Sequence, residues 1–145
     1  MTPRAVSSDR FWERFIVPAL LSRVDDARRW SSGLARRAAV PEDTIQDLEL
    51  AVTEALSNTI RHGYGEDPGQ RIELSLEISP ERIAFSIVDR GRPLDPSRKP
   101  DVDLDHPREG GYGLFLIEQL TDEVSRTPHD DGGTLVTLVK YRKEH

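Results

Sequence analysis

The chain has 145 residues, 36% of them hydrophobic and 32% charged, with a formal net charge of −6 and a pI near 5.2. This length suits one domain over residues 1–145, with a loose tail at residues 1–10. The acidic net charge argues against a direct nucleic-acid partner. The absence of cysteine excludes disulfides, thiolate metal sites and cysteine nucleophiles. No stretch approaches the roughly 20 apolar residues of a membrane span, and the first ten residues lack the apolar core of a signal peptide, so we expect a cytoplasmic protein without a membrane partner.

The first forty residues predict a strand followed by a helix. Residues 11–19, FWERFIVPA, alternate imperfectly and predict an edge strand that Pro18 closes. A helix is predicted from about Ser22 through Arg37, because apolar residues recur there at helical spacing while the opposite face is rich in Arg and Asp. The apolar positions of this helix are Leu21, Val24, Ala27, Trp30 and Leu34.

A second helix is predicted from Pro41 to Gly63, since proline suits the first helical position and glycine the end. Within it, Glu54, Asn58 and His62 follow one another at intervals of four residues, which places them in one stripe. These polar groups must satisfy their hydrogen bonds within the protein, in solvent, or with a ligand such as a hydrated divalent cation with phosphates. The neighbouring positions predicted to be buried are Leu48, Ala51, Val52, Ala55, Leu56, Thr59 and Ile60.

The middle of the chain predicts a loop and a hairpin. Residues 63–69 contain three glycines and a proline and predict the loop. Residues 71–78 alternate strictly between apolar and polar, and residues 82–89 do so again after a Ser-Pro-Glu turn. The two segments predict an antiparallel hairpin with one solvated face.

The last third begins with a long irregular segment, residues 89–113, which has four prolines and ends in a glycine cluster. A segment of this length within a compact domain is either a functional lid or disordered. A helix then opens at Leu114, a short strand follows at residues 124–126, and a final strand at residues 134–141. Strands gathered around a hairpin with all helices on one face predict an α+β fold, specifically a two-layer α/β sandwich.

Several of these segments carry residue types suited to a phosphorylated ligand. A glycine-rich turn that opens a helix, here Gly111 and Gly113, presents backbone N–H groups to an anion. Asp89 at a strand end can accept a hydrogen bond from an exocyclic amine, and Gly91 would let a planar ring approach the backbone. Each pattern alone also fits an ordinary turn.

The stripe on the second helix adds two groups suited to phosphoryl chemistry. The side-chain carbonyl oxygen of Asn58 suits Mg²⁺ that is held partly by substrate phosphates. Glu54 lies one turn earlier and could polarise a hydroxyl or a water that attacks the terminal phosphate.

Taken together, the motifs resemble the GHKL ATP-binding fold of gyrase-type ATPases, Hsp90 and histidine kinases. Residues 54–58, EALSN, resemble its N box; Asp89-Arg90-Gly91 resembles the first glycine box, Gly111-Tyr112-Gly113 the second, and Gly133-Thr134 the closing motif. The resemblance runs in order from about Phe11 to Tyr141. It implies a mostly antiparallel mixed sheet with the helices on one face, an ATP lid at residues 90–112, and ATP with Mg²⁺ as the ligands.

Within that fold, the segments TEALSNTIRHGY, DRGRPLDP and GGYGLFLIEQLTDEV are most similar to the bacterial anti-sigma-factor serine/threonine kinases. The resemblance implies a cytoplasmic regulator of transcription that binds a sigma factor and phosphorylates a small anti-anti-sigma (STAS-type) antagonist, in a group that often forms homodimers. Residues 11–17 are the candidate edge for such a dimer. Two other interpretations remain open: a nucleotide-binding module without catalysis, and a detached ATPase domain of the histidine-kinase type.

The resemblance also implies a role for each matching residue. Glu54 would be the catalytic carboxylate, Asn58 the Mg²⁺ ligand, and His62 a neighbour of the phosphates or merely the polar end of a helix. Asp89 would read the adenine amino group with support from Thr134. The glycines have two roles: Gly91 would leave room for the base, while Gly111 and Gly113 would carry the phosphate-binding end of the lid.

Overall fold

The computed structural model describes residues 10–64, 66–89, 117, 119–129 and 133–142. These residues form a sheet in which every neighbouring pair of strands is antiparallel, in the order β1-β2-β3-β5-β4. This agrees with the mostly antiparallel sheet that the resemblance implied, and none of the described pairs is parallel. Its strands are β1 (Phe11–Ala19), β2 (Asp67–Ile78), β3 (Arg82–Asp89), β4 (Glu123–Pro128) and β5 (Thr134–Tyr141).

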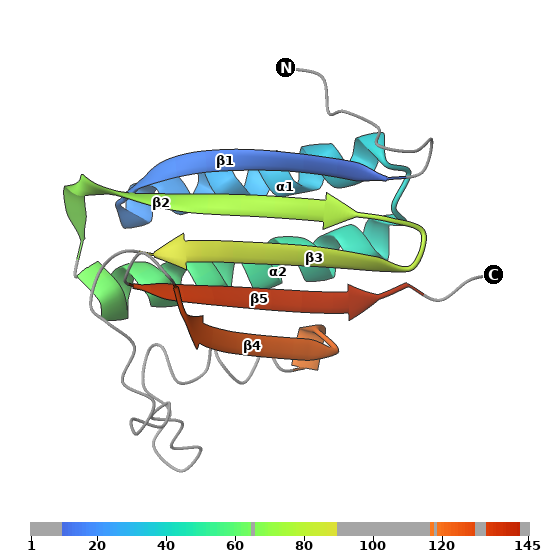
Figure 1. Cartoon of the computed structure of the whole chain (residues 1–145). Coiled ribbons are helices and arrows are strands. Elements are labelled where there is room, and N and C mark those ends of the chain that lie inside the picture. Colours follow the sequence, from blue (N-terminus) through green and yellow to red (C-terminus); the bar gives the residue numbers. More distant parts are fainter. Residues whose placement is uncertain (1–9, 65, 90–116, 118, 130–132, 143–145) are drawn as a thin grey trace, which may run out of the picture.

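Two long helices, α1 (Val24–Arg37) and α2 (Glu42–Thr59), lie on one face of this sheet (Figure 1). The predicted α+β sandwich is therefore confirmed. A 3₁₀ turn, Leu21–Arg23, precedes α1, so the first helix begins slightly later than predicted. No helix among the described residues has both the length and the apolar character that crossing a bilayer requires.

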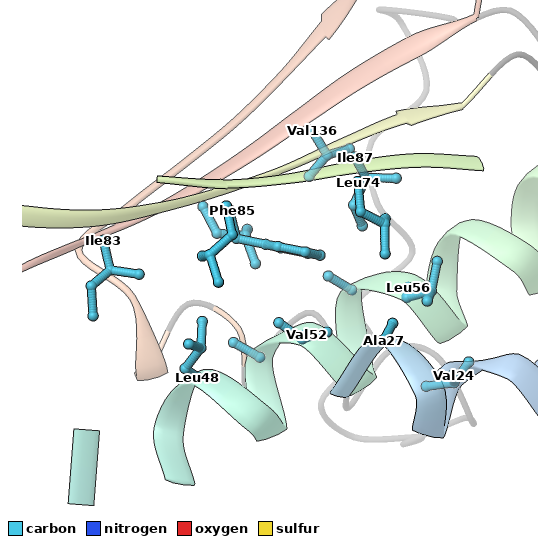
Figure 2. Close-up of a cluster of buried hydrophobic side chains, with 14 of the residues drawn as sticks. Val24, Ala27, Leu48, Val52, Leu56, Leu74, Ile83, Phe85, Ile87 and Val136 are labelled. Carbon is cyan, nitrogen blue, oxygen red and sulfur yellow. The ribbon is translucent and has the colours of Figure 1, made fainter. Parts of the chain in front are cut away.

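The core lies between the helices and the sheet, and its side chains show which way α2 runs relative to the strands. On α2, Leu48 lies toward Ile83 of β3, whereas Leu56 lies toward Ile87 of the same strand (Figure 2). Helix α2 and strand β3 therefore run in the same direction. All four of these side chains are at most 7% exposed.

The second helix does not remain α-helical to Gly63 as predicted. It changes at Ile60 into a π-helical turn, Ile60–Tyr64. The Ile60 N–H bonds to the carbonyl oxygens of both Leu56 and Ser57 at this change. A π turn contains more residues than an α turn and is found frequently at functional sites.

The predicted loop at residues 63–69 is also shorter than expected, because β2 already begins at Asp67. Asp67 pairs with Ala19 after a register shift between Pro18 and Ala19 in β1. This pairing is made by the backbone, so the start of β2 has no alternating apolar pattern from which it could be predicted. Just before it, Glu66 has a positive φ of 64°, and its carboxylate accepts the Leu21 N–H at 3.0 Å. This bond satisfies a donor at the start of the helical segment that leads into α1.

Candidate functional site

Asn58 has a side chain without a hydrogen-bond partner among the described residues. It lies near the end of α2, is 5% exposed, and neither its Oδ1 nor its Nδ2 atom has a partner. A buried amide in this state costs free energy, and native proteins rarely retain one without a function. The amide is therefore available to a ligand at this position.

Glu54 lies one helical turn before Asn58 and is partly exposed. Residues four apart on an α-helix lie on the same side, so α2 brings this carboxylate and the amide of Asn58 together. His62 differs, because it lies within the π turn and is exposed. The spacing rule of an α-helix does not apply within this π turn, so the proximity of His62 to phosphates stays a prediction.

Asp89 and Thr134 form the second part of the site. They are direct partners in the antiparallel pair of β3 with β5, and they are 7% and 6% exposed. Gly133 is buried and has a φ of 89°, a conformation that suits glycine and strains other residues. Its carbonyl accepts the His129 N–H at 3.2 Å, which closes the hairpin of β4 and β5 beside Thr134.

These two parts lie at the same edge of the sheet. Figure 1 shows the end of α2 at the edge where β3 ends and β5 begins. Asn58 follows the core residue Leu56 by two positions, and Asp89 follows Ile87 by two positions. Since α2 and β3 run in the same direction, the amide and the carboxylate lie at matching ends of the helical layer and the sheet.

The predicted glycines Gly91, Gly111 and Gly113 lie outside the described residues, as does the whole predicted lid at residues 90–112. In the part of the chain that is described, no three His, Cys, Asp or Glu side chains come together as a metal cage. The described site therefore offers a polar amide, a carboxylate one turn away, and a buried acceptor with a neighbouring hydroxyl. This set suits a ligand that brings phosphate oxygens and an amine.

Comparisons with known proteins agree with this geometry. The family model described as the histidine kinase-like ATPase domain matches residues 17–140. A serine-protein kinase named RsbW from Oceanobacillus iheyensis is 34% identical over 136 residues, covering 88% of this chain and 85% of that protein. The RsbW serine-protein kinase of Staphylococcus aureus is 37% identical over 138 residues, with the same two coverages.

A solved structure shows the same fold. The crystal structure of the RsbU and RsbW domains of a Mycobacterium tuberculosis protein aligns with a TM-score of 0.60 and 21% identity, over 92% of this chain and 34% of that one. The family match extends over almost all of the described elements, from within β1 to within β5. This chain therefore belongs to the family of histidine kinase-like ATPase domains, which use ATP.

Proposed function

We propose that this chain is a bacterial anti-sigma factor that sequesters a sigma factor and uses ATP to phosphorylate a serine or threonine of an anti-anti-sigma antagonist. The observation that carries the proposal is the buried amide of Asn58, which has no hydrogen-bond partner within the described part of the chain. It lies one turn from Glu54, at the sheet edge that holds Asp89 and Thr134. The relatives named serine-protein kinase, at 34% and 37% identity, support the same activity. This proposal matches the interpretation that the sequence motifs favoured.

In this proposal, ATP lies across the edge with its base toward the sheet and its phosphates toward α2. The carboxylate of Asp89 accepts a hydrogen bond from the adenine amino group, and the Thr134 hydroxyl supports that contact. Gly91 leaves room for the base, and Gly111 and Gly113 offer backbone N–H groups to the phosphates. His62 is assigned to the neighbourhood of the phosphates on the resemblance alone.

We assign Mg²⁺ to the amide oxygen of Asn58, because hard cations prefer oxygen ligands and leave most remaining positions to phosphate and water. The unpartnered state of that amide fits such a role. When bound, the ion would neutralise charge on the phosphate oxygens.

The transfer step follows from these positions. The hydroxyl oxygen of the antagonist forms a bond to the γ-phosphorus while the bond from that phosphorus to the bridging oxygen breaks, and ADP leaves with the electron pair. Glu54 accepts the hydroxyl proton. Its partial exposure leaves the carboxylate accessible to a protein substrate.

A homodimer through β1 belongs to the same proposal. This strand is nine residues long and lies at a margin of the sheet, and its Trp12 and Ile16 side chains are each 48% exposed. The opposite margin, β4, is shorter and ends in Pro128, a residue that blunts strand pairing. Light scattering at increasing concentration tests the dimer, and a monomer throughout would remove it.

Calorimetric titration with ATP, with and without Mg²⁺, tests the nucleotide site. We expect binding that Mg²⁺ strengthens, and a large loss of affinity in an Asp89→Asn variant that remains folded. Binding that is indifferent to Asp89 would mean that the nucleotide is not held as proposed. An intact chain that binds no nucleotide would overturn the kinase assignment.

A further inference from the structure

The face of the sheet opposite the helices is open in the described part of the chain. Helices α1 and α2 both lie on the other face (Figure 1). Because side chains alternate along a strand, every second residue of the five strands points to this open face. On β1 these residues include Trp12 and Ile16, each 48% exposed. The two side chains that mark β1 as the dimer strand therefore belong to the open face.

The middle of the open face carries no charged side chain among the described residues of β3 and β5 that point to it. The residues there are small, β-branched or aliphatic: Ala84, Ser86, Val88, Leu135, Thr137 and Val139. The hydroxyl oxygens of Ser86 and Thr137 lie 3.2 Å apart, so these two polar groups bond to each other across the strands. In a chain with 32% charged residues, a solvated strand face is expected to carry charges. The middle therefore has the character of a surface that a partner covers.

Charged side chains surround this middle on β1, β2 and β4 and at the start of β3. Three of them are arginines and three are glutamates: Arg14, Arg71, Arg82, Glu73, Glu77 and Glu123. Arg14 pairs with Glu73 at 2.9 Å. Arg82 lies 3.5 Å from Glu77. An uncharged centre with a polar rim is the usual anatomy of a protein–protein interface.

The balance of these charges indicates the kind of partner. Three cations and three anions give the strand residues of this face no net charge, although the whole chain has a net charge of −6. A strongly acidic or strongly basic partner would gain no net attraction here. A second copy presents the same mixture of cations and anions, so charges on one copy can meet opposite charges on the other.

The size of the open face also suits a second copy. Five strands about 4.8 Å apart and about 27 Å long present about 650 Å² of face. This area approaches the roughly 800 Å² that each partner buries in a stable interface. Two antiparallel sheets can pack face to face about 10 Å apart, with their side chains forming a shared core. The short side chains in the middle of this face permit that approach.

We infer that a second copy of this chain packs against the open face, so that the two sheets form the inside of a dimer and the helices its outside. The inference rests on the homodimer of the proposed function, and it places the second copy against the face of β1 rather than along its edge. Helix α2, with Glu54 and Asn58, then lies on the outside of each copy. Both nucleotide sites therefore stay accessible to a protein substrate while the dimer is intact.

Cysteine cross-linking distinguishes the face from the edge, because the chain itself has no cysteine. Ser86 lies on β3, the middle strand of the sheet. Packing of the two faces brings the thiols of Ser86→Cys within reach of a short bismaleimide, whereas pairing along the β1 edges separates them by five strand spacings, about 24 Å. We expect covalent dimers from Ser86→Cys and none from Gln46→Cys, a matched control at an exposed position of α2.

A charge at the centre of the face should break the dimer. Ser86→Arg would bury two arginines against each other, so we expect the dissociation constant of the dimer to rise at least about a hundredfold. Gln46→Arg makes the same change of charge on α2 and should leave this constant unchanged. Sedimentation equilibrium measures both constants. Circular dichroism checks the fold of Ser86→Arg, whose new side chain extends into solvent in the monomer.

The outcomes separate the inference from the proposed function. A dimer that survives Ser86→Arg and gives no cross-link through Ser86→Cys would place the second copy at the edge of β1, which overturns the inference and leaves the dimer standing. A chain that stays monomeric at every concentration would overturn the inference together with the dimer, and would leave the face to a different protein. Titration of the same sample with ATP reports separately on the nucleotide site.

Discussion

Asp89 and Thr134 face each other across the antiparallel pair of β3 with β5, and both side chains are buried at the edge where α2 ends. A buried carboxylate that accepts a hydrogen bond from the adenine amino group should also reject guanine, which has a carbonyl oxygen at that position. We predict that Asp89→Asn lowers ATP affinity about tenfold or more and raises the affinity for GTP relative to ATP, because the new amide can donate. Competition titrations with both nucleotides measure this.

Thr134→Val is the companion variant for that experiment, since it keeps the shape and removes the hydroxyl. Its expected loss of ATP affinity is smaller than that of Asp89→Asn, with no change in preference between the two bases. A variant of Asp89 that retains full selectivity for ATP would assign base recognition to other residues.

Asn58 should show opposite effects on binding and stability. Asn58→Leu replaces a buried, unpartnered amide with an apolar side chain of similar size, so we expect the free energy of unfolding without ligand to rise by about 1 kcal/mol. The strengthening of ATP binding by Mg²⁺ should disappear. Urea unfolding and calorimetry measure the two effects, and a marked loss of stability would mean that the amide is already satisfied in the folded protein.

Glu54→Gln keeps the size of the side chain but removes the base. We predict that phosphorylation of the antagonist slows about 100-fold to 10,000-fold, the usual range for a general base. ATP affinity should stay near that of the unmodified chain. Glu42→Gln is the control on the same helix, because Glu42 pairs with Arg36 far from the site. Normal transfer by Glu54→Gln would remove the proposed role.

The chemical stability of the transferred phosphate separates the kinase from a detached ATPase domain of the histidine-kinase type. A phosphoserine or phosphothreonine survives acid, whereas a phosphohistidine does not. We expect label from γ-labelled ATP to remain on the antagonist after acid treatment. Label that acid removes would favour the histidine-kinase interpretation.

Asp25 on α1 gives a prediction for the dependence of stability on pH. A hydrogen bond from Arg28 holds the pKa of the Asp25 carboxyl below its ordinary value of 3.8. The folded state therefore prefers the ionised form, and the resulting stabilisation is present above pH 3.8 and lost as pH falls through the lower folded pKa. The stabilities of the unmodified chain and Asp25→Asn should converge in that acid range, as chemical denaturation can show. A constant difference between them would contradict this linkage.

Patterns of apolar residues predicted the core well, because burial on a sheet or a helix follows the period of that element. The alternating residues of β2 illustrate this, since Ile72, Leu74, Leu76 and Ile78 are each fully buried. The stripe of Glu54 and Asn58 was also predicted correctly as far as the regular helix extends. The unpartnered state of the Asn58 amide could not be predicted, because it depends on every group that surrounds the side chain.

Features that depend on the backbone or on distant contacts were missed. The π turn at Ile60–Tyr64 has no strong signal in local sequence, and it places His62 outside the regular α-helix. The pairing of Asp67 with Ala19 joins residues far apart in the chain. The ion pair of Lys140 with Asp47 likewise joins residues far apart in the chain.

The bond from the Leu21 N–H to the Glu66 carboxylate has a consequence for the order of assembly. During synthesis, Leu21, in the 3₁₀ turn before α1, leaves the ribosome 45 residues before Glu66, whose carboxylate accepts its N–H. This donor must bond to water until α2 and its π turn are complete. Glu66 also adopts a left-handed backbone conformation, which is unfavourable for a residue other than glycine. The Leu21 N–H should therefore become protected from hydrogen exchange only after Glu66 has left the ribosome.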